Sequence, residues 1–319
     1  MMETVLCLAP MRGLTDYIYR NTFIRHFKGI DIAVAPFVTT FSARRVKPSH
    51  LKDVWPENNT DLVLIPQILS NSSPDFIALA RTLFDMGYPT VNWNLGCPFP
   101  KVAKKMRGSG LLPYPDKIDA FLDKVITAIP GRLSIKTRIG RNSSGELEAL
   151  IQVFNAYPLS ELIVHPRTGI QMYDGVVDLN AFEYCLENAN HRLVYNGDIN
   201  DRISFERLQQ RYPSVRAWMI GRGILADPFL AEEIKNKRLD HRDKLWRFKA
   251  FHDDLYQNYA QVLCGPGHLV DRMKGFWRYF STSFDDGHAV LKKVRKINRV
   301  DHYTDFIESF FEQSAVWIA

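Results

Sequence analysis

Eight short apolar segments, separated by stretches with helical spacing, constrain the fold of this chain more than any other feature. The apolar segments are residues 5–9, 31–35, 62–66, 90–94, 133–138, 161–165, 193–196 and 217–221. Several are nearly continuous in apolar or β-branched residues, as buried parallel strands are. Helical spacing recurs between them, for example over residues 73–84, 116–128, 145–156 and 204–211. Ser73 and Asp116 are the expected N-caps of two of these helices.

This alternation predicts an α/β fold, namely a (β/α)8 TIM barrel. A doubly wound open sheet is the alternative. The pattern changes near Lys235, after which the strand signals stop and helices are expected at residues 242–259, 268–283, 289–298 and 303–313. We therefore predict two domains, a barrel over residues 1–239 and a smaller helical domain over residues 240–319.

Composition narrows the environment of the protein. The 319 residues are 46% hydrophobic and 24% charged, as in an ordinary globular protein, and no stretch approaches the length of a membrane span. Four scattered cysteines without a CxxC pair predict a reducing cytoplasm and no metal site. Residues 1–10 are interpreted as a first strand and not as a signal peptide. The net charge of +6 is compatible with a polyanionic partner.

Polar residues stand at nearly every predicted strand end. In a (β/α)8 barrel the chemistry lies at the carboxyl ends of the strands. Those ends carry Pro10 and Met11, Gln67, Asn94 and Cys97, Lys136 and Arg138, His165 and Arg167, Asn196 to Asp198, and Gly221 to Gly223. Each has a structural alternative, since Lys136 could extend to solvent and His165 could be a core histidine. Together they predict an active site at this end of the barrel.

The segment Asn94-Leu95-Gly96-Cys97-Pro98 is the most informative of these ends. Gly96 and Pro98 stop the strand, so the Cys97 thiol is expected to face open space, near a Gly108-Ser109-Gly110 loop. A thiol there can transfer a proton or attack a substrate. The alternative is a tight turn in which Cys97 has no chemical role.

The ends of the seventh and eighth strands predict a phosphate site. Their glycines, Gly197 and Gly221, let backbone N–H groups approach an anion, and Arg222 adds charge-assisted hydrogen bonds. Two ordinary turns are the alternative. Lys136 could stabilise negative charge on an electron-accepting ring, which fits flavin mononucleotide (FMN). No GxGxxG sequence joins a strand to a helix, so a classical dinucleotide site is not expected.

At this point the chain resembles the tRNA-dihydrouridine synthases. The matching segments run in family order and are residues 8–16, 66–67, 94–98, 108–112, 135–138, 164–168, 195–199 and 220–223, with a further likeness over residues 268–278. The Asn-Leu-Gly-Cys-Pro segment is the most diagnostic part. The tail resembles most the DusC type, which acts on position 16 of the tRNA.

The resemblance implies an FMN-binding barrel, NADPH as reductant and a helical tRNA-binding domain. Reduced FMN would pass a hydride to C6 of a uracil, and Cys97 would protonate C5. Asn94, Arg167 and Tyr173 would bind the substrate. The implied cofactor-binding residues are Pro10, Met11, Gln67, Lys136, His165, Asn196, Gly197, Asp198, Gly221 and Arg222. The target base would have to be pulled out of the folded tRNA.

Two basic clusters in the tail are the expected contacts with the tRNA backbone. Lys292, Arg295, Lys296 and Arg299 fall at i, i+3, i+4 and i+7 and should share one helical face, opposite Val290, Val294 and Ile297. Arg272, Lys274 and Arg278 lie one helix earlier. A solvated charged face is the alternative, and beside the barrel the tRNA contact is preferred.

Two other functions stay open at this stage. One is a flavoenzyme acting on a free pyrimidine, against which the basic tail argues. The other is a tRNA-binding protein without turnover, against which Cys97, Lys136 and His165 argue. The chain is expected to be a monomer that needs no obligate protein partner and does not associate with a membrane.

Overall fold

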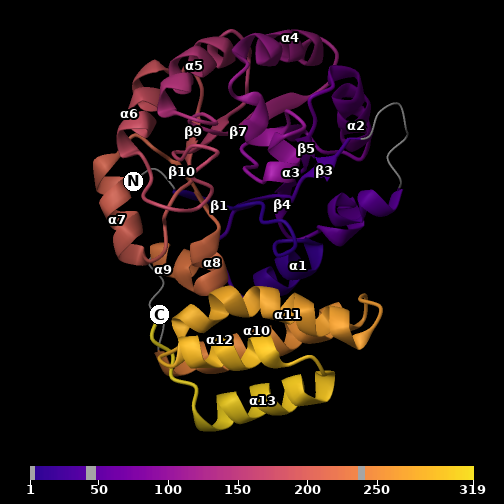
Figure 1. The fold of residues 1–319 in the computed structure, drawn as a ribbon, viewed down its shortest axis with the longest axis vertical. Helices are drawn as coiled ribbons and strands as arrows, with labels where there is room; N and C mark the ends of the chain where they lie inside the picture. Colours follow the sequence, from indigo (N-terminus) through magenta and orange to yellow (C-terminus); the bar gives the residue numbers. More distant parts are fainter. Residues whose placement is uncertain (1–3, 41–47, 236–240) are drawn as a thin grey trace. The chain divides into compact units, whose positions relative to one another are not determined.

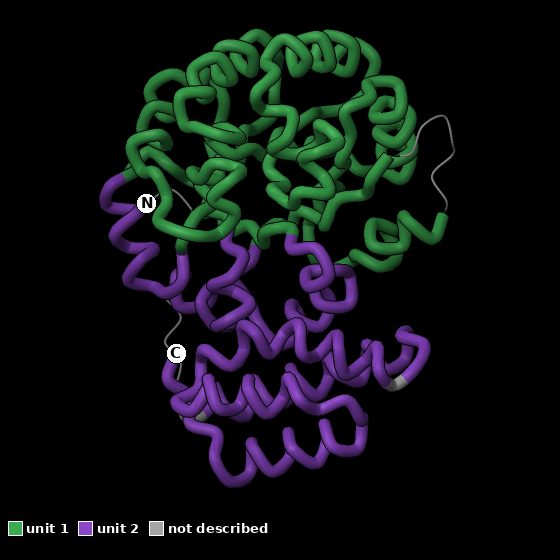
Figure 2. The backbone as a smooth tube through the Cα atoms, viewed as in Figure 1, with its two compact units in different colours: residues 1–10, 31–198, 212–219 green, residues 11–30, 199–211, 220–319 purple. Residues whose placement is uncertain are grey.

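The computed structural model describes residues 4–40, 48–235 and 241–319, apart from the side chains of residues 241, 242 and 266. The chain divides into two compact units (Figure 2). Unit 1 comprises residues 1–10, 31–198 and 212–219, and unit 2 comprises residues 11–30, 199–211 and 220–319. The predicted domain boundary at residues 239–240 lies outside the described residues, so the proposed domain division stays a prediction.

One parallel sheet forms the centre of unit 1. Its strands are β1 Val5–Leu8, β2 Ile32–Val34, β3 Val38–Thr39, β4 Val63–Ile65, β5 Gln67–Leu69, β6 Thr90–Leu95, β7 Arg132–Arg138, β8 Leu162–His165, β9 Leu193–Tyr195 and β10 Ala217–Ile220. The order across the sheet is β3-β5-β6-β7-β8-β9-β10-β1-β2-β4. All eight predicted strands are therefore confirmed within one or two residues.

The sheet closes into a barrel, although two of its strands are interrupted. β2 and β3 follow one another in the chain, as do β4 and β5, which only Pro66 separates. Pro66 has no N–H with which to continue the ladder. β2 pairs with β4, and β3 pairs with β5. The two ends of the strand order are thus the two halves of the same neighbouring pair, which confirms the (β/α)8 barrel and excludes the open sheet.

The helices of unit 1 cover the outside of these strands (Figure 1). They are α2 Ser73–Asp85, α3 Pro100–Ala103, α4 Pro115–Ile126, α5 Leu147–Asn155 and α6 Leu179–Asn188, with 3-10 turns η1 Pro48–His50, η2 Lys52–Val54, η3 Pro56–Asn58, η4 Gly108–Leu111 and η5 Ser144–Glu146. α2 buries Phe76, Leu79, Ala80 and Leu83, one side of a helix.

The two predicted N-caps are wrong. Ser72 caps α2 by accepting a hydrogen bond from the Asp75 backbone, and Tyr114 precedes α4 without a side-chain cap. In both helices a proline holds one of the first two positions, where its missing N–H costs nothing. The helix therefore begins at or before that proline, earlier than Asp116 in α4.

The barrel interior holds a small apolar cluster in unit 1. Its buried members are Cys7, Ala9, Val34, Ile163, Val194, Ala217 and Met219. They lie on or next to five consecutive strands of the sheet, β8, β9, β10, β1 and β2. Cys7 packs in this cluster as an apolar side chain, in keeping with the usual behaviour of a buried thiol.

Unit 2 is helical. Its elements are α1 Tyr17–His26, α7 Arg202–Arg211, α8 Arg222–Ala226, α9 Leu230–Ile234, α10 His241–Ala260, α11 Pro266–Phe280, η6 Ser281–Ser283, α12 Gly287–Lys296 and α13 Val300–Gln313. The four predicted tail helices are confirmed. They pack through aromatic side chains, for example Phe248 against Phe280 and Phe284 against Phe310. No helix in the described ranges is long and apolar enough to span a membrane.

Candidate active site

The turn that carries Cys97 is held by Asn94. β6 ends at Leu95, and the Asn94 side chain reaches forward over the turn that follows. Its Oδ1 atom accepts hydrogen bonds from the Gly96 and Cys97 backbone N–H groups, at 3.1 and 2.9 Å. Such side-chain-to-backbone bonds stabilise a turn at the expense of the strand. The predicted substrate-binding residue Asn94 thus also positions the Cys97 backbone.

The carbonyl groups of the same turn have their own partners. Arg138 Nε donates to the Gly96 carbonyl at 2.9 Å. The Ser109 N–H and hydroxyl both donate to the Cys97 carbonyl at 3.0 Å. Arg141 donates to the Pro98 carbonyl at 3.2 Å. The position of Cys97 is therefore determined from three sides, by β6, by β7 with its loop and by η4.

The Cys97 thiol is buried, so the expectation that it faces open space is wrong. Cys97 is only 7% exposed. The Gly108 backbone approaches it so closely that a Cβ on Gly108 would lie 2.7 Å from the Cys97 carbonyl oxygen and 2.8 Å from the Cys97 Cβ. Gly108 also has φ +56°, which favours glycine. A glycine is required here by both space and backbone conformation.

A chain of hydrogen-bonded polar side chains links three neighbouring strands, β5, β6 and β7, beside this turn. Asn94 Nδ2 donates to Gln67 Oε1 at 2.7 Å, and Gln67 Nε2 donates to Asn92 Oδ1 at 2.7 Å. Asn92 Nδ2 then donates to the Ser134 hydroxyl at 2.8 Å. These groups are buried and hydrogen-bonded to one another, so they fix the orientation of Asn94. Gln67, a predicted cofactor ligand, is thereby held in one orientation.

Lys136 stands on β7 directly opposite Asn94 in the strand register. Burial lowers the pKa of Lys136 to about 7, with a further lowering by the Arg138 guanidinium and an opposing effect of Cys97. Its ammonium group has no hydrogen-bond partner among the residues that the structure describes. Lys136 is thus an amino group close to Cys97 whose protonated form can bind an anionic or electron-rich group.

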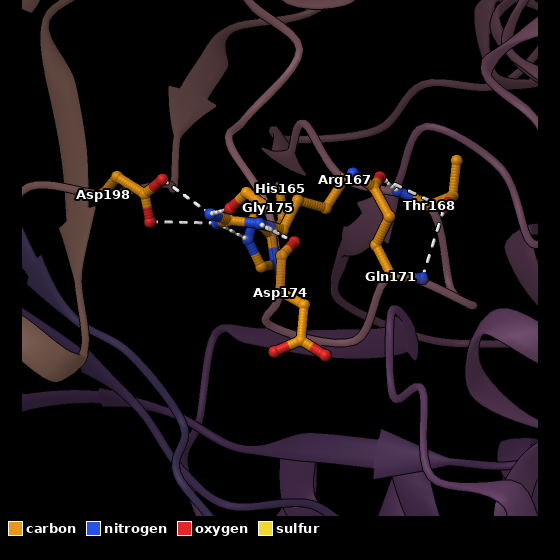
Figure 3. Close-up of polar contacts among 7 residues, drawn as sticks. All are labelled: His165, Arg167, Thr168, Gln171, Asp174, Gly175 and Asp198. Atoms are coloured by element: carbon orange, nitrogen blue, oxygen red, sulfur yellow. Dashed lines mark hydrogen bonds and ion pairs between the residues drawn. The ribbon is translucent and has the colours of Figure 1, made fainter.

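His165 and Arg167 meet at the end of β8, as Figure 3 shows. Arg167 Nη1 lies 3.2 Å from His165 Nε2. The guanidinium also forms two bonds to the Asp198 carboxylate, at 2.9 and 2.6 Å, and donates to the Gly175 carbonyl at 2.6 Å. Because a guanidinium only donates, His165 Nε2 is the acceptor of their bond. Arg167 therefore positions His165 and the loop that follows it.

Tyr173 lies on that loop and is 42% exposed. Its ring centre is 6.3 Å from the His165 ring and 5.4 Å from the Arg138 guanidinium. The loop is tied down at its start, where Arg138 donates to the Thr168 carbonyl at 2.8 Å and Gln171 accepts from the Thr168 N–H at 2.7 Å (Figure 3 shows the latter bond). A planar ring therefore stands beside His165, in a position suited to contact a base.

The remaining predicted residues of unit 1 follow β1 and β9. Pro10 comes two residues after β1 and is partly exposed. Asn196 Nδ2 donates to the Met219 carbonyl at 2.8 Å. A Cβ on Gly197 would lie 2.8 Å from Val177, so this glycine allows close packing. Asp198, with φ +41°, directs its carboxylate to Arg167. The barrel therefore gathers the predicted residues of unit 1 at the carboxyl ends of its strands.

Three predicted cofactor ligands belong to unit 2. Met11 opens a tight turn, in which its N–H donates to the Thr15 hydroxyl at 2.8 Å and its carbonyl accepts from Leu14 and Thr15. Gly221 precedes α8, which begins at Arg222. Met11, Gly221 and Arg222 are each partly exposed. Their roles toward a phosphate stay predictions.

The α11 cluster is partly engaged within unit 2. Arg272 binds the Gly13 carbonyl, lies 3.5 Å from Asp16 and stacks 5.0 Å from the Tyr259 ring. Lys274 donates to Asn298 Oδ1 at 2.9 Å. Arg278 is exposed. Arg272 therefore holds the loop before α1, whereas Arg278 is exposed to solvent.

The predicted basic face of α12 is correct for three of its four members. Lys292, Arg295 and Lys296 are exposed on α12, and Val290 and Val294 are buried on its other side. Arg299 is not on this helix, because α12 ends at Lys296 and Arg299 is the extended N-cap of α13. Arg299 forms an ion pair with Asp301. The helical periodicity does not extend past residue 296, so the inclusion of Arg299 in this face is corrected.

Asn92, Ser134 and Arg141 are site residues that sequence reasoning missed. Asn92 has the same strand parity as Asn94, and this spacing of two is the signal that could have identified it. Ser134 and Arg141 lie on and just after β7, and nothing in their local sequence indicates which distant group they contact.

Comparisons with known proteins identify the family to which the sequence is similar and the fold that it shares. Residues 7–312 match the family model described as dihydrouridine synthase (Dus). The tRNA-dihydrouridine synthase B of Vibrio cholerae is 25% identical over 98% of both chains. A probable tRNA-dihydrouridine synthase of Rhodobacter capsulatus is 26% identical, covering 82% of this chain and 81% of its own. The solved old yellow enzyme of Trypanosoma cruzi shares the fold, with TM-score 0.53, 10% identity and coverage of 74% and 89%.

Proposed function

Because the chain belongs to the dihydrouridine synthase family, we propose that it reduces a uridine of tRNA to 5,6-dihydrouridine, using FMN and NADPH. The observation that carries this proposal is the pairing of two groups at one end of the barrel. The backbone around the Cys97 thiol is held by Asn94, Ser109 and Arg138. The Lys136 ammonium lies near it without a hydrogen-bond partner among the described residues.

The residues of the barrel fit a flavin. The half-buried amino group of Lys136 has a lowered pKa and lies near a thiol, so its charged form is costly unless it meets an electron-rich partner, and the pyrimidine edge of a flavin is such a partner. Lys136, His165 and Gln67 would hold the ring, and the turns at Gly197 and Gly221 would supply backbone N–H groups for the phosphate. When bound, reduced FMN would supply a hydride to C6 of the uracil. NADPH would then reduce the oxidised flavin again.

Cys97 would supply the proton for C5 of the same base. A thiol that carries its proton can act as a general acid. The hydrogen bonds to the peptide groups on both sides of Cys97 hold the thiol in one place. This positioning matters because proton transfer needs the acid within hydrogen-bond reach of the carbon. Tyr173 would contact the base from the loop after β8.

The substrate is proposed to be tRNA and not a free pyrimidine. A free base needs no basic surface outside the site, whereas α12 presents Lys292, Arg295 and Lys296 to solvent. The uridine at position 16 is proposed from the likeness of the helical tail to the DusC type, while the relatives compared above include the B type. A location in the cytoplasm and a monomeric state of the protein also remain predictions.

The test uses the purified protein. It is expected to be yellow, to release FMN on denaturation, and to form dihydrouridine in unmodified tRNA when NADPH is present. Free uridine should not be reduced at a comparable rate. Primer-extension mapping would then identify the modified position. A protein that binds FMN but reduces free uridine as fast as tRNA would overturn the substrate class, and a protein that binds no FMN would overturn the chemistry.

A further inference from the structure

A basic surface without acidic neighbours in sequence follows the Cys97 turn in unit 1. We name it the α3 surface and define it as Phe99, Lys101, Lys104, Lys105, Met106 and Tyr114, each of which is exposed. It begins two residues after Cys97, so its first lysine, Lys101, lies within about 14 Å of Cys97 between Cα atoms. The α3 surface therefore adjoins the proposed position of the target base.

The positive charge of the α3 surface is not neutralised locally. No acidic residue occurs from Cys97 through Pro115. The ammonium groups of Lys101, Lys104 and Lys105 form no ion pair or hydrogen bond with any residue that the structure describes. Elsewhere in the described residues some cations do have an ionic partner, for example Arg202 with Glu206 and the half-buried Lys249 with Asp253. Three unpaired ammonium groups within five residues favour a polyanionic partner.

The backbone under these lysines is held in place. Arg107 donates to Asn71 Oδ1 at 3.1 Å and to the Thr40 carbonyl at 3.2 Å. Asn71 Nδ2 in turn donates to the Lys105 carbonyl at 3.0 Å. The α3 surface is therefore fastened to the loops that follow β3 and β5. Such preorganisation lowers the entropy lost when a ligand binds.

Exposed aromatic rings accompany the charges. Phe99 is 48% exposed and Tyr114 is 43% exposed. The Lys117 ammonium lies 4.7 Å from the centre of the Tyr114 ring and 3.7 Å from Met106 Sδ, so Tyr114 and Met106 belong to one patch. Basic side chains beside aromatic rings bind single-stranded nucleic acid, the cations on phosphates and the rings on bases. A solvated lysine face would not need these exposed rings.

We propose that the α3 surface binds the sugar-phosphate backbone of the tRNA nucleotides next to the target uridine. This inference rests on the proposed function, because it takes tRNA as the substrate. A base pulled from the tRNA must bring its neighbouring phosphates to the rim of the barrel. Lys101, Lys104 and Lys105 would bind those phosphates, and Phe99 would contact an unstacked base. The α3 surface adds a second RNA contact to that expected from α12.

The test compares two triple variants that remove the same charge. The first is Lys101→Ala with Lys104→Ala and Lys105→Ala. The control is Lys124→Ala with Arg132→Ala and Arg216→Ala, three exposed cations of unit 1. Arg132 opens β7 and Arg216 precedes β10, so these two lie at the amino ends of strands, away from the Cys97 turn. Urea unfolding of both variants checks that they fold.

Filter-binding titrations of flavin-loaded protein with tRNA, at several salt concentrations, give the result. Each lost phosphate contact should lower the slope of log K against log salt by about 0.7–0.9. The α3 variant should therefore bind tRNA more weakly and with a flatter slope, while the control should keep the slope of the wild type. FMN content and NADPH oxidation should be unchanged in both. Equal slopes for all three proteins would overturn the inference.

Assaying dihydrouridine formation separates this inference from the proposed function. If the wild type forms dihydrouridine and the α3 variant keeps wild-type affinity and slope, only the α3 surface inference fails. If the wild type forms none with any tRNA, the proposed function fails, whatever the binding curves show. A loss of affinity that the control triple shares equally would indicate a non-specific charge effect and would also overturn the inference.

Discussion

Arg167 and Asp198 form a two-pronged ion pair that joins the loops after β8 and β9. The two bonds measure 2.9 and 2.6 Å, and Arg167 is 2% exposed. Parallel bonds between a guanidinium and a carboxylate fix both groups in a plane. The same guanidinium contacts His165 and the Gly175 carbonyl, as Figure 3 shows. A residue proposed for substrate binding thereby also determines how the active-site loop is held.

Removing the carboxylate of this pair should destabilise the protein. Asp198→Ala leaves the buried Arg167 guanidinium without its charge partner, which should cost about 3 kcal/mol of unfolding free energy. Urea unfolding measures the change. Glu206→Ala is the matched control, because it breaks the exposed pair with Arg202 and should cost no more than about 0.5 kcal/mol. Equal losses in the two variants would contradict the buried role of Arg167.

Replacing Gly108 should disturb the Cys97 turn. Gly108→Ala places a Cβ less than 3 Å from Cys97 and also strains a backbone with φ +56°. Gly87→Ala is the control, since Gly87 has φ +95° but no heavy atom within 4 Å of the added Cβ. Both should lose about 1 kcal/mol or more of stability from backbone strain. Only Gly108→Ala should lose most dihydrouridine formation, which a tRNA assay would measure.

Cys97→Ala should separate the two halves of the proposed reaction. The variant should keep its flavin and its NADPH oxidation, because neither needs an acid at C5. Dihydrouridine formation should fall by about 10²–10⁴-fold, the usual contribution of a general acid. Stopped-flow absorbance follows the flavin, and nucleoside analysis follows the product. Wild-type product formation by this variant would reject the role of Cys97.

Lys136 should make stability depend on pH in the flavin-free protein. Burial lowers its pKa from 10.5 to about 7, the nearby Arg138 guanidinium lowers it further, and Cys97 opposes this lowering. Between these two values the unfolded chain binds more protons than the folded protein, so the unfolding free energy should rise with pH. Lys136→Met has no proton to bind and should lose this part of the rise. Urea unfolding at about pH 7 and about pH 9 compares the two proteins, and equal slopes would contradict the lowered pKa.

The exposed cations of α12 should contribute more to tRNA binding than Arg299 does. Lys292→Ala with Lys296→Ala should weaken tRNA binding and flatten its salt dependence, because both cations are exposed on α12. Arg299→Ala should have a smaller effect, since Arg299 lies outside the helix and pairs with Asp301. Filter binding at several salt concentrations compares the variants. If Arg299→Ala weakened tRNA binding more than the double change, Arg299 would belong to the RNA-binding surface after all.

Local patterns in the sequence were sufficient to predict the barrel and to group the candidate site residues at one end of it. A buried parallel strand needs a short apolar run, and each of the eight runs is a strand in the structure. The carboxyl ends of parallel strands meet at one edge, so Cys97, Lys136 and His165 could be assigned to one site from their order alone. Neither inference needs any knowledge of which distant groups touch.

Only the tertiary structure decided what the polar side chains bind. Asn94 and Arg167 look alike in sequence as strand-end residues, yet Asn94 holds the Cys97 backbone and Arg167 pairs with Asp198. The Gly108 backbone packs against Cys97, although Gly108 is eleven positions further along the chain. Hydrogen bonds and ion pairs act over about 3 Å, so they depend on how separate segments pack. Apolar periodicity, by contrast, is set by neighbours in the same strand or helix, and the sequence alone reveals it.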